Sequence, residues 1–359
     1  MKRIAAVVLL SALLSAAGNL FGSDEKPRIS FSGVLWTSYW ASLGSEPSPS
    51  TERGQNAFEI KRAYLIASAP LNEQWSWKIT YEFSGAPTLY PFAKVALVKW
   101  APRTIWAESL TFGLQPTLIW GLSEEYWGYR PVMVVAREGI SKTIVGINNE
   151  LITGASSDFG FTWSIRPIPQ TSISLQVANG AGHKGVEANR QKKVSGAVTV
   201  KWMPEGVVQL YIEDEPGYND GVKKVSRTGL GLLTGFRSEQ FAAGVDYFVK
   251  NFDDKSATDE VIAYAVSFFG DYALTNKLKL LGRVDRYDLQ NKAWFRNNFN
   301  GKPGETLIIA GADCSYGPPN THFTLTCQSR IFEAKIQDGD SYVDRNPSLV
   351  IALDVAMSF

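Results

Sequence analysis

The sequence predicts an all-β fold, a transmembrane β-barrel of sixteen antiparallel strands. Three observations predict it: a long two-faced strand at the C-terminus, an export signal at the N-terminus, and connections that alternate between short and long. Together they predict a single barrel domain over residues 28–359.

Residues 348–359 alternate strictly in polarity. Side chains point to opposite faces along a strand, so one face of this segment is apolar and the other carries small or polar groups. At about 12 residues it exceeds the usual five or six of a soluble sheet and suits the roughly 9–11 of a transmembrane strand. The final Phe359 also resembles the C-terminal signature that the barrel-assembly machinery recognises in bacterial outer-membrane barrels. The apolar face consists of Leu349, Ile351, Leu353, Val355, Met357 and Phe359.

The first residues form an export signal. Lys2 and Arg3 precede an apolar run over 4–14, and small residues follow up to position 18. This pattern predicts a signal peptide over 1–17, a short N-terminal segment over 18–27, and destination in the bacterial outer membrane. The apolar run is too short for a spanning helix, although a buried N-terminal helix is the alternative.

Composition agrees with a barrel. With 45% hydrophobic residues and a mean hydropathy of -0.10, the chain cannot supply a bundle of apolar spanning helices. Barrels have such averages because lumen-facing polar residues dilute the lipid-facing ones. The formal charge of +1 indicates no nucleic-acid partner.

Two-faced segments recur along the whole domain. An even number allows an antiparallel barrel to close with both ends in the periplasm, and closure removes unpaired edges. The predicted strands are 28–41, 56–69, 75–84, 92–100, 109–116, 157–166, 171–179, 193–202, 207–214, 226–237, 240–250, 259–270, 276–287, 305–315, 320–331 and 348–359.

The connections support this count. Those after even-numbered segments, such as 70–74 and 203–206, are short, whereas those after odd-numbered segments, such as 42–55 and 289–304, are long. Outer-membrane barrels have short periplasmic turns and long outer loops. Aromatic residues that form an interfacial girdle should lie at the short-turn ends. They are Trp75, Trp100, Trp202, Phe241 and Phe359.

The connection over 117–156 is exceptionally long, and loops of that length are usually functional. Here the sequence resembles the phosphate-selective porin O and P family in residues 58–63 (FEIKRA), 112–116 (FGLQP), 124–130 (EEYWGYR) and 158–160 (DFG). The resemblance implies a homotrimer of water-filled pores for passive diffusion, in which this third outer loop folds into the lumen and narrows it. Only the Lys61 and Arg62 pair matches the arginine-lined positions of the phosphate-binding members.

Selectivity in a pore depends on the charges and the width of its constriction. Both signs occur among the candidates, and an acidic loop facing a basic wall would set up a transverse field. Each charge could instead be an ordinary solvated side chain, and the mixture leaves the solute open among small hydrophilic molecules and ions, anions included. The candidates are Glu124, Glu125, Tyr126, Arg130 and Arg137 in the connection, with Lys61, Arg62, Lys78, Glu82, Lys201, Arg283 and Asp285, together with Glu213, Asp246 and Lys279, on polar strand faces.

Two other classes of outer-membrane barrel, an enzyme and a transporter of hydrophobic solutes, are alternatives to a porin. A barrel enzyme with a Ser-His-Asp device needs a positioned histidine, and only His183 and His322 exist, one in a predicted outer loop and one beside a turn. We therefore expect no enzymatic activity, no cofactor and no metal site. A barrel for hydrophobic solutes would need an N-terminal plug domain, and the first predicted strand begins directly after the signal.

The two cysteines test the strand register. Cys314 and Cys327 lie in one predicted hairpin, offset by about five positions, or roughly 16 Å. A disulfide requires Cα atoms within about 7 Å. The register predicts two free thiols.

Overall fold

The computed structural model describes residues 28–43, 56–84, 90–104, 106–133, 156–180, 182, 191–219, 224–253, 261–289, 305–316, 320–332, 336–338, 341–343 and 348–359. The predicted signal peptide, the segment 18–27, His183 and Arg137 lie outside these residues.

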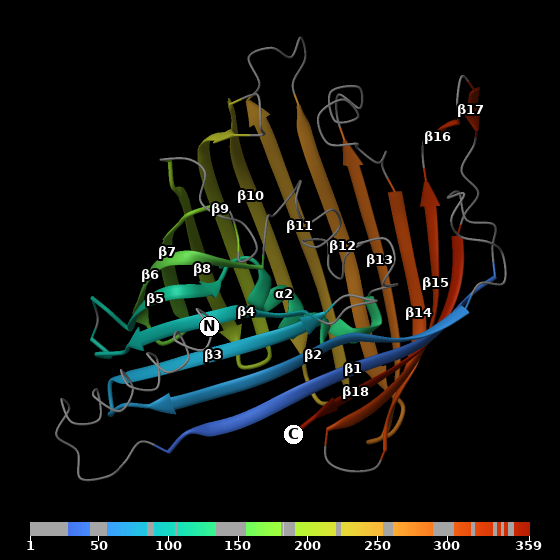
Figure 1. Ribbon diagram of the computed structural model, residues 1–359, viewed down its shortest axis with the longest axis horizontal. Coiled ribbons are helices and arrows are strands. Elements are labelled where there is room, and N and C mark those ends of the chain that lie inside the picture. Colours follow the sequence, from blue (N-terminus) through green and yellow to red (C-terminus); the bar gives the residue numbers. More distant parts are fainter. Residues whose placement is uncertain are drawn as a thin grey trace.

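Sixteen antiparallel strands form a closed barrel, so the predicted fold class is confirmed (Figure 1). The predicted boundaries fall within a few residues of the observed ones, except that β9 extends five residues further. The strands are β1 (Ser30–Ser42), β2 (Asn56–Pro70), β3 (Trp75–Ser84), β4 (Tyr90–Trp100), β5 (Ser109–Pro116), β6 (Ser157–Ile168), β7 (Thr171–Ala178), β8 (Lys193–Met203), β9 (Gly206–Asn219), β10 (Lys224–Arg237), β11 (Phe241–Asp253), β12 (Ile262–Ala273), β13 (Leu278–Leu289), β14 (Glu305–Ser315), β15 (Thr321–Phe332) and β18 (Ser348–Ser358).

The barrel closes where β1 pairs with β18. Beyond β18, the Phe359 N–H donates to the Gly33 carbonyl at 3.0 Å, and the Gly33 N–H donates to the Phe359 carbonyl at 2.8 Å. The phenyl ring lies so close to Gly33 that an added Cβ would be 2.2 Å from it. Phe359 thus completes the seam against the first strand.

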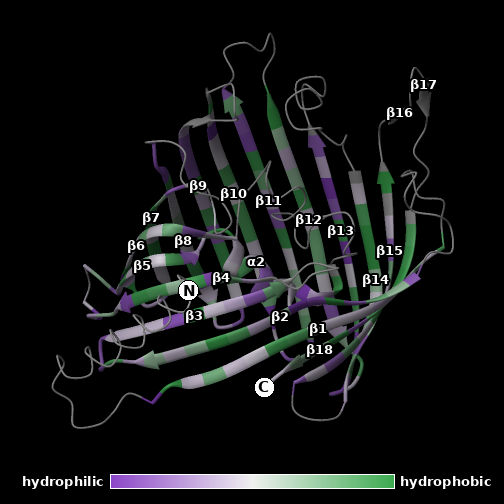
Figure 2. Ribbon diagram, in the orientation of Figure 1, coloured by the Kyte–Doolittle hydropathy of each residue, from purple (hydrophilic) through white to green (hydrophobic). Residues whose placement is uncertain are grey.

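The wall has an apolar outer face and a polar inner face. In β18, Leu353 is 41% exposed, whereas the next residue, Asp354, is fully buried. Figure 2 shows the same alternation of hydrophobic and hydrophilic bands along most strands. Within the residues described, no helix has the length and apolar character needed to cross a membrane.

The predicted girdle residues lie at the short-turn ends. Trp75 and Trp100 stack with ring centroids 5.8 Å apart. Trp202, Phe241 and Phe359 are exposed on the outer surface. These rings can sit at a membrane–water interface, where aromatic side chains are enriched.

Both cysteines are free and exposed. Cys314 lies opposite Phe323, and Cys327 lies opposite Ala310. The offset along β14 is therefore four positions, too far for a disulfide, and the predicted register is confirmed to within one residue.

Four short elements were not predicted. Helix α2 (Trp120–Trp127) and the 3-10 helix η1 (Arg130–Met133) lie in the long connection between β5 and β6. The strands β16 (Ile336–Asp338) and β17 (Ser341–Val343) form a separate hairpin between β15 and β18.

Candidate functional site

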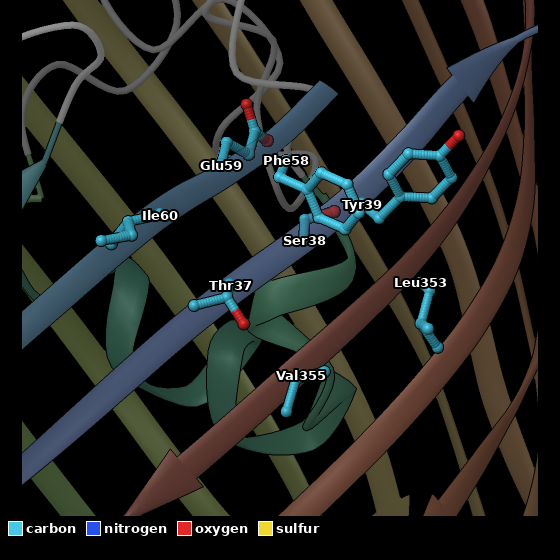
Figure 3. Close-up of a pocket in the computed structure, with 8 residues that line it drawn as sticks. All are labelled: Thr37, Ser38, Tyr39, Phe58, Glu59, Ile60, Leu353 and Val355. Atoms are coloured by element: carbon cyan, nitrogen blue, oxygen red, sulfur yellow. The ribbon is translucent and has the colours of Figure 1, made fainter. Parts of the chain in front are cut away.

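Of the long connection between β5 and β6, residues 117–133 lie inside the barrel. Figure 1 shows α2 within the ring of strands, and Figure 3, viewed through the wall at β1, β2 and β18, shows the helical segment behind them. Helix α2 ends at Gly128, whose φ of 77° gives the left-handed conformation common at helix C-termini. Trp120, Tyr126 and Trp127 are all at most 5% exposed, so the connection is packed as part of a core.

Polar bonds hold one side of this connection to β10 and β11. The Ser123 hydroxyl donates to the Asp246 carboxylate at 2.6 Å. The Arg237 guanidinium donates to the carbonyls of Tyr126 at 2.6 Å and Trp127 at 3.0 Å. These carbonyls are near the end of α2, where a cation is electrostatically favoured.

The other side of the connection is held by β2 and β15. The Lys61 ammonium donates to the Pro131 carbonyl at 3.0 Å, and the Gln328 amide donates to the Val132 carbonyl at 2.7 Å. Because the four tethers come from separated parts of the ring, the connection crosses the interior of the barrel.

Glycines in β10 make room for α2. A Cβ on Gly235 would lie 2.5 Å from the Tyr126 ring, and one on Gly231 would lie 3.3 Å from Ile119. Apolar inner side chains of β10–β14 complete this surface, which we call the helix seat. It includes Leu233, Phe248, Phe269, Leu281, Tyr287, Leu307 and Ile309.

Opposite the helix seat, Lys61 and Arg62 both reach the inner face. The register against β1 shifts there, with Trp36 opposite Arg62 and Thr37 opposite Ile60, so Lys61 is the extra residue of a β-bulge. Lys61 forms a buried ion pair with Asp354 of β18.

A second bulge places Lys94 on the same wall. In the pairing of β3 with β4, Thr80 lies opposite Val95 and Tyr81 opposite Ala93, which leaves Lys94 as the extra residue. Its ammonium is 2.7 Å from Glu82, and the Arg62 guanidinium is 3.1 Å from the same carboxylate. Alternation alone missed Lys94, because a bulge shifts the inner face by one residue.

Two aromatic rings lie among these cations. Trp36 and Tyr64 meet edge to face, with centroids 5.5 Å apart. The guanidinium carbons of Arg62 and Arg130 lie within 6.0 Å of both ring centroids, a range at which cation–π attraction operates. Arg130 also pairs with Glu124 at 2.9 Å, so this loop carboxylate meets a cation of its own connection.

The outer half of the lumen near β8–β11 holds another ion-pair group. The Glu213 carboxylate pairs with Lys193 and, at 2.7 Å, with Lys250. Both lysines lie on the polar face that the alternation along their strands defines, so the sequence pattern could have identified them. The predicted set included only Glu213.

Three further ion pairs involve residues of β10, β12 and β13. Arg283 and Asp285 are 2.7 Å apart. Asp271 lies 3.3 Å from Arg237 and 3.6 Å from Lys279. Most buried charges of the described wall are thus matched by an opposite charge.

The remaining predicted residues do not join these clusters. Lys78 and Lys201 are exposed near the short-turn ends of β3 and β8, and Glu125 is exposed on α2. Tyr126 packs into the helix seat.

A cavity of about 340 Å³ lies below the connection, toward the short turns. Tyr129 lines it, and burial together with the nearby Asp271 and Asp313 carboxylates raises the pKa of its phenol. Tyr129 therefore stays protonated and can donate a hydrogen bond. The other polar side chains in the lining are Arg130, Arg237, Lys279, Asp313, Asn320, His322, Thr324 and Ser358.

A second cavity, of about 430 Å³, lies at β1, β2 and β18 (Figure 3). Tyr39 and Phe58 lie beside each other there, with ring centroids 4.7 Å apart. Phe58 is 86% exposed, which suits an apolar environment better than water.

The described residues contain no group of three or more potential metal ligands. Nδ1 of His322 is 3.0 Å from Asp313 and 3.3 Å from the Ser315 hydroxyl. A catalytic triad needs the nucleophile and the carboxylate on opposite ring nitrogens, so this trio has the wrong geometry for one.

Comparisons with known proteins find similarity in structure only. No protein-family profile matches the sequence. No curated protein sequence matches it either. Solved barrels align over nearly the whole chain. The outer membrane channel DcaP of Acinetobacter baumannii is 12% identical with a TM-score of 0.65, covering 94% of this chain and 99% of its own.

Two other solved structures agree. The anion-selective porin from Comamonas acidovorans is 9% identical with a TM-score of 0.64, covering 93% of this chain and 100% of its own. OmpT of Vibrio cholerae is 12% identical with a TM-score of 0.61, covering 94% and 99%. At these identities the likeness establishes the fold: the chain has the sixteen-stranded barrel architecture of bacterial outer-membrane porins.

Proposed function

We propose that the protein is an outer-membrane porin, a water-filled channel for passive diffusion of small hydrophilic or charged solutes. The observation that supports this most is the long connection across the inside of a closed barrel, tethered to β2, β10, β11 and β15. A loop in that position narrows a lumen without blocking the ends of the barrel.

The width and charge of the passage then depend on this connection and the wall opposite it. Lys61, Arg62, Glu82 and Lys94 supply the wall, and Arg130 with Glu124 supplies the loop. A passage between them is lined by paired charges and by the Trp36 and Tyr64 rings.

The alternatives receive less support. A barrel enzyme would need a catalytic arrangement, and the histidine in the described part of the chain contacts Asp313 and Ser315 through one nitrogen. A hydrophobic-solute barrel would need an apolar route, whereas the wall facing the loop is charged. We therefore propose a channel without enzymatic activity.

Finer assignments follow the resemblance to the phosphate-selective porin O and P family. We propose a homotrimer in the outer membrane that is inserted by the barrel-assembly machinery. Trimeric OmpT of Vibrio cholerae has the same fold. Preference for phosphate has little support, because the cations beside Lys61 already pair with carboxylates.

The proposal is tested by single-channel recording in planar bilayers. Deleting residues 123–137 should enlarge the conductance, because residues 123–133 lie inside the barrel, while the protein keeps the heat-dependent gel mobility of a folded barrel. A folded deletion variant with unchanged conductance would contradict the assignment of the constriction, and a folded wild-type protein that conducts no ions would contradict the channel itself.

A further inference from the structure

We propose that the inner face of β5–β8 binds uncharged, polyhydroxylated solutes of sugar size, so that the channel discriminates by hydrogen bonding. This inference rests on the proposed function as a channel. We call the surface the hydroxyl wall. It consists of Ser109, Thr111, Gln115, Thr162, Ser164, Ser172, Ser174, Gln176, Ser195 and Thr199.

The strand register brings these side chains together. Thr111 lies opposite Thr162, and Thr162 lies opposite Gln176. Ser164 lies opposite Ser174 in the neighbouring pair. Paired residues in adjacent strands share one face, so the groups form a continuous surface with strands about 4.8 Å apart.

The hydroxyl wall carries no charge. All four strands are described completely, and their inner-face charges occur only toward the ends. Asp158 and Lys193 lie at the outer end, whereas Arg166 and Lys201 lie near the short turns. Every inner position between them is Ser, Thr, Gln, Gly or Ala. An ion beside this wall gains hydrogen bonds but no counter-charge.

The wall has hydrogen-bonding capacity to spare. The Ser164 and Ser174 hydroxyls are 2.8 Å apart, and the Gln176 amide donates to the Thr162 hydroxyl at 2.9 Å. Each hydroxyl has one donor and two acceptor sites, so single bonds leave sites for a ligand. Ser164 and Ser174 are also only half-buried.

One member of the wall points to a missing partner. The Nε2 amide of Gln115 is buried and has no hydrogen-bond partner among the described residues, and Gln115 is only 2% exposed. A buried donor of this kind is normally satisfied by protein, water or ligand. A hydroxyl oxygen of a solute suits this amide once the Gln115 side chain turns toward the lumen, because a neutral amide N–H needs an acceptor and not a charge.

The chemistry defines the solute class. A molecule with several neutral hydroxyls can exchange its bonds to water for bonds to the wall, whereas an apolar molecule of equal size leaves the wall groups unpaired. On the opposite side of the lumen, ions of either sign meet charged side chains that are already paired with each other, such as Lys61 with Asp354. The favoured class is therefore neutral sugars and similar polyols.

The test compares D-glucose with gluconate in liposome-swelling assays on the reconstituted full chain. The triple variant Thr162→Val, Ser164→Ala, Ser174→Ala removes three hydroxyls with little change of shape. Its rate of liposome swelling in glucose should fall about three- to tenfold, since each lost hydrogen bond contributes modestly. The gluconate rate and the KCl conductance should stay close to those of the unaltered protein. Thr234→Val is the matched control, since Thr234 is exposed on the outer face of β10.

If the triple variant does not fold, Thr111→Val with Thr199→Val makes the same comparison, because both hydroxyls belong to the wall and are half-buried. If a folded wall variant has the same ratio of the glucose swelling rate to the gluconate swelling rate as the unaltered protein, the inference is overturned. So would a reversal potential in a KCl gradient that shows strong selectivity for one ion by the unaltered channel. Absence of any conductance would contradict the proposed channel function and is thereby distinguished from failure of the hydroxyl wall.

Discussion

At the scale of single residues, Lys61 joins three parts of the molecule. Its ammonium pairs with Asp354 of β18 and donates to the Pro131 carbonyl of η1. The side chains of Lys61 and Asp354 are only 3% and 0% exposed. One cation thereby links β2, β18 and the connection between β5 and β6.

Lys61→Met should destabilise the barrel by about 3–5 kcal/mol, because it leaves the Asp354 carboxylate buried without its cation. The double variant Lys61→Met, Asp354→Leu should recover most of this loss, since it removes both charges. The measurement is urea unfolding of protein refolded into detergent micelles. If the double variant is as unstable as Lys61→Met, then an unpaired carboxylate is not the cause.

Phe359 is a second single residue whose role can be tested, in assembly of the barrel as against its stability. Its backbone pairs with Gly33, but its ring is 79% exposed, so it stabilises the folded state by little packing. Phe359→Ala should therefore lower the amount of assembled barrel in cells more than it lowers the stability of the refolded protein. Tyr316→Ala is the control, since Tyr316 is another highly exposed aromatic residue beside a short turn, 71% exposed. Equal losses in both assays would mean that Phe359 serves packing alone.

At the scale of elements, the helix seat determines where α2 lies. Gly235 leaves space that the Tyr126 ring fills. Gly235→Val should push α2 away from β10 and change the single-channel conductance, at a cost of about 1–3 kcal/mol in stability for overpacking. The control is Gly282→Val, because an added Cβ at Gly282 meets nothing closer than 3.9 Å. The same conductance for both variants would contradict the assignment of the helix seat.

The sequence predicted the strands better than the site, for reasons that lie in particular elements. Alternation located β3 and β14 at their observed bounds, because period two is visible in any two-faced strand. It could not identify α2, since an eight-residue helix buried on several sides lacks a clear polar face. Nor could it place Lys94, because a bulge breaks the alternation and depends on the neighbouring strand.

At the scale of the whole molecule, the interior is divided among three kinds of surface. Apolar side chains of β10–β14 receive α2, whereas β5–β8 present neutral hydroxyl and amide groups. Buried ion pairs occupy β1–β4 and β18. A channel of this construction has many charges in its sequence, and most of those on its inner wall lie beside an opposite charge.

The conductance should consequently rise nearly in proportion to KCl concentration, even at low salt. At low salt the Debye length is long, about 30 Å at 0.01 M, and uncompensated charges in a pore then concentrate counter-ions. As the KCl concentration is lowered, the conductance of such a pore decreases less than the KCl concentration does. Glu82→Gln should strengthen that effect, because it removes the one carboxylate that pairs with both Arg62 and Lys94. The variant should become more anion-selective and lose proportionality at low salt, whereas Glu239→Gln, at an exposed site in the short turn between β10 and β11, should change neither property. A Glu82→Gln channel with an unchanged reversal potential would show that solutes do not pass beside Arg62 and Lys94.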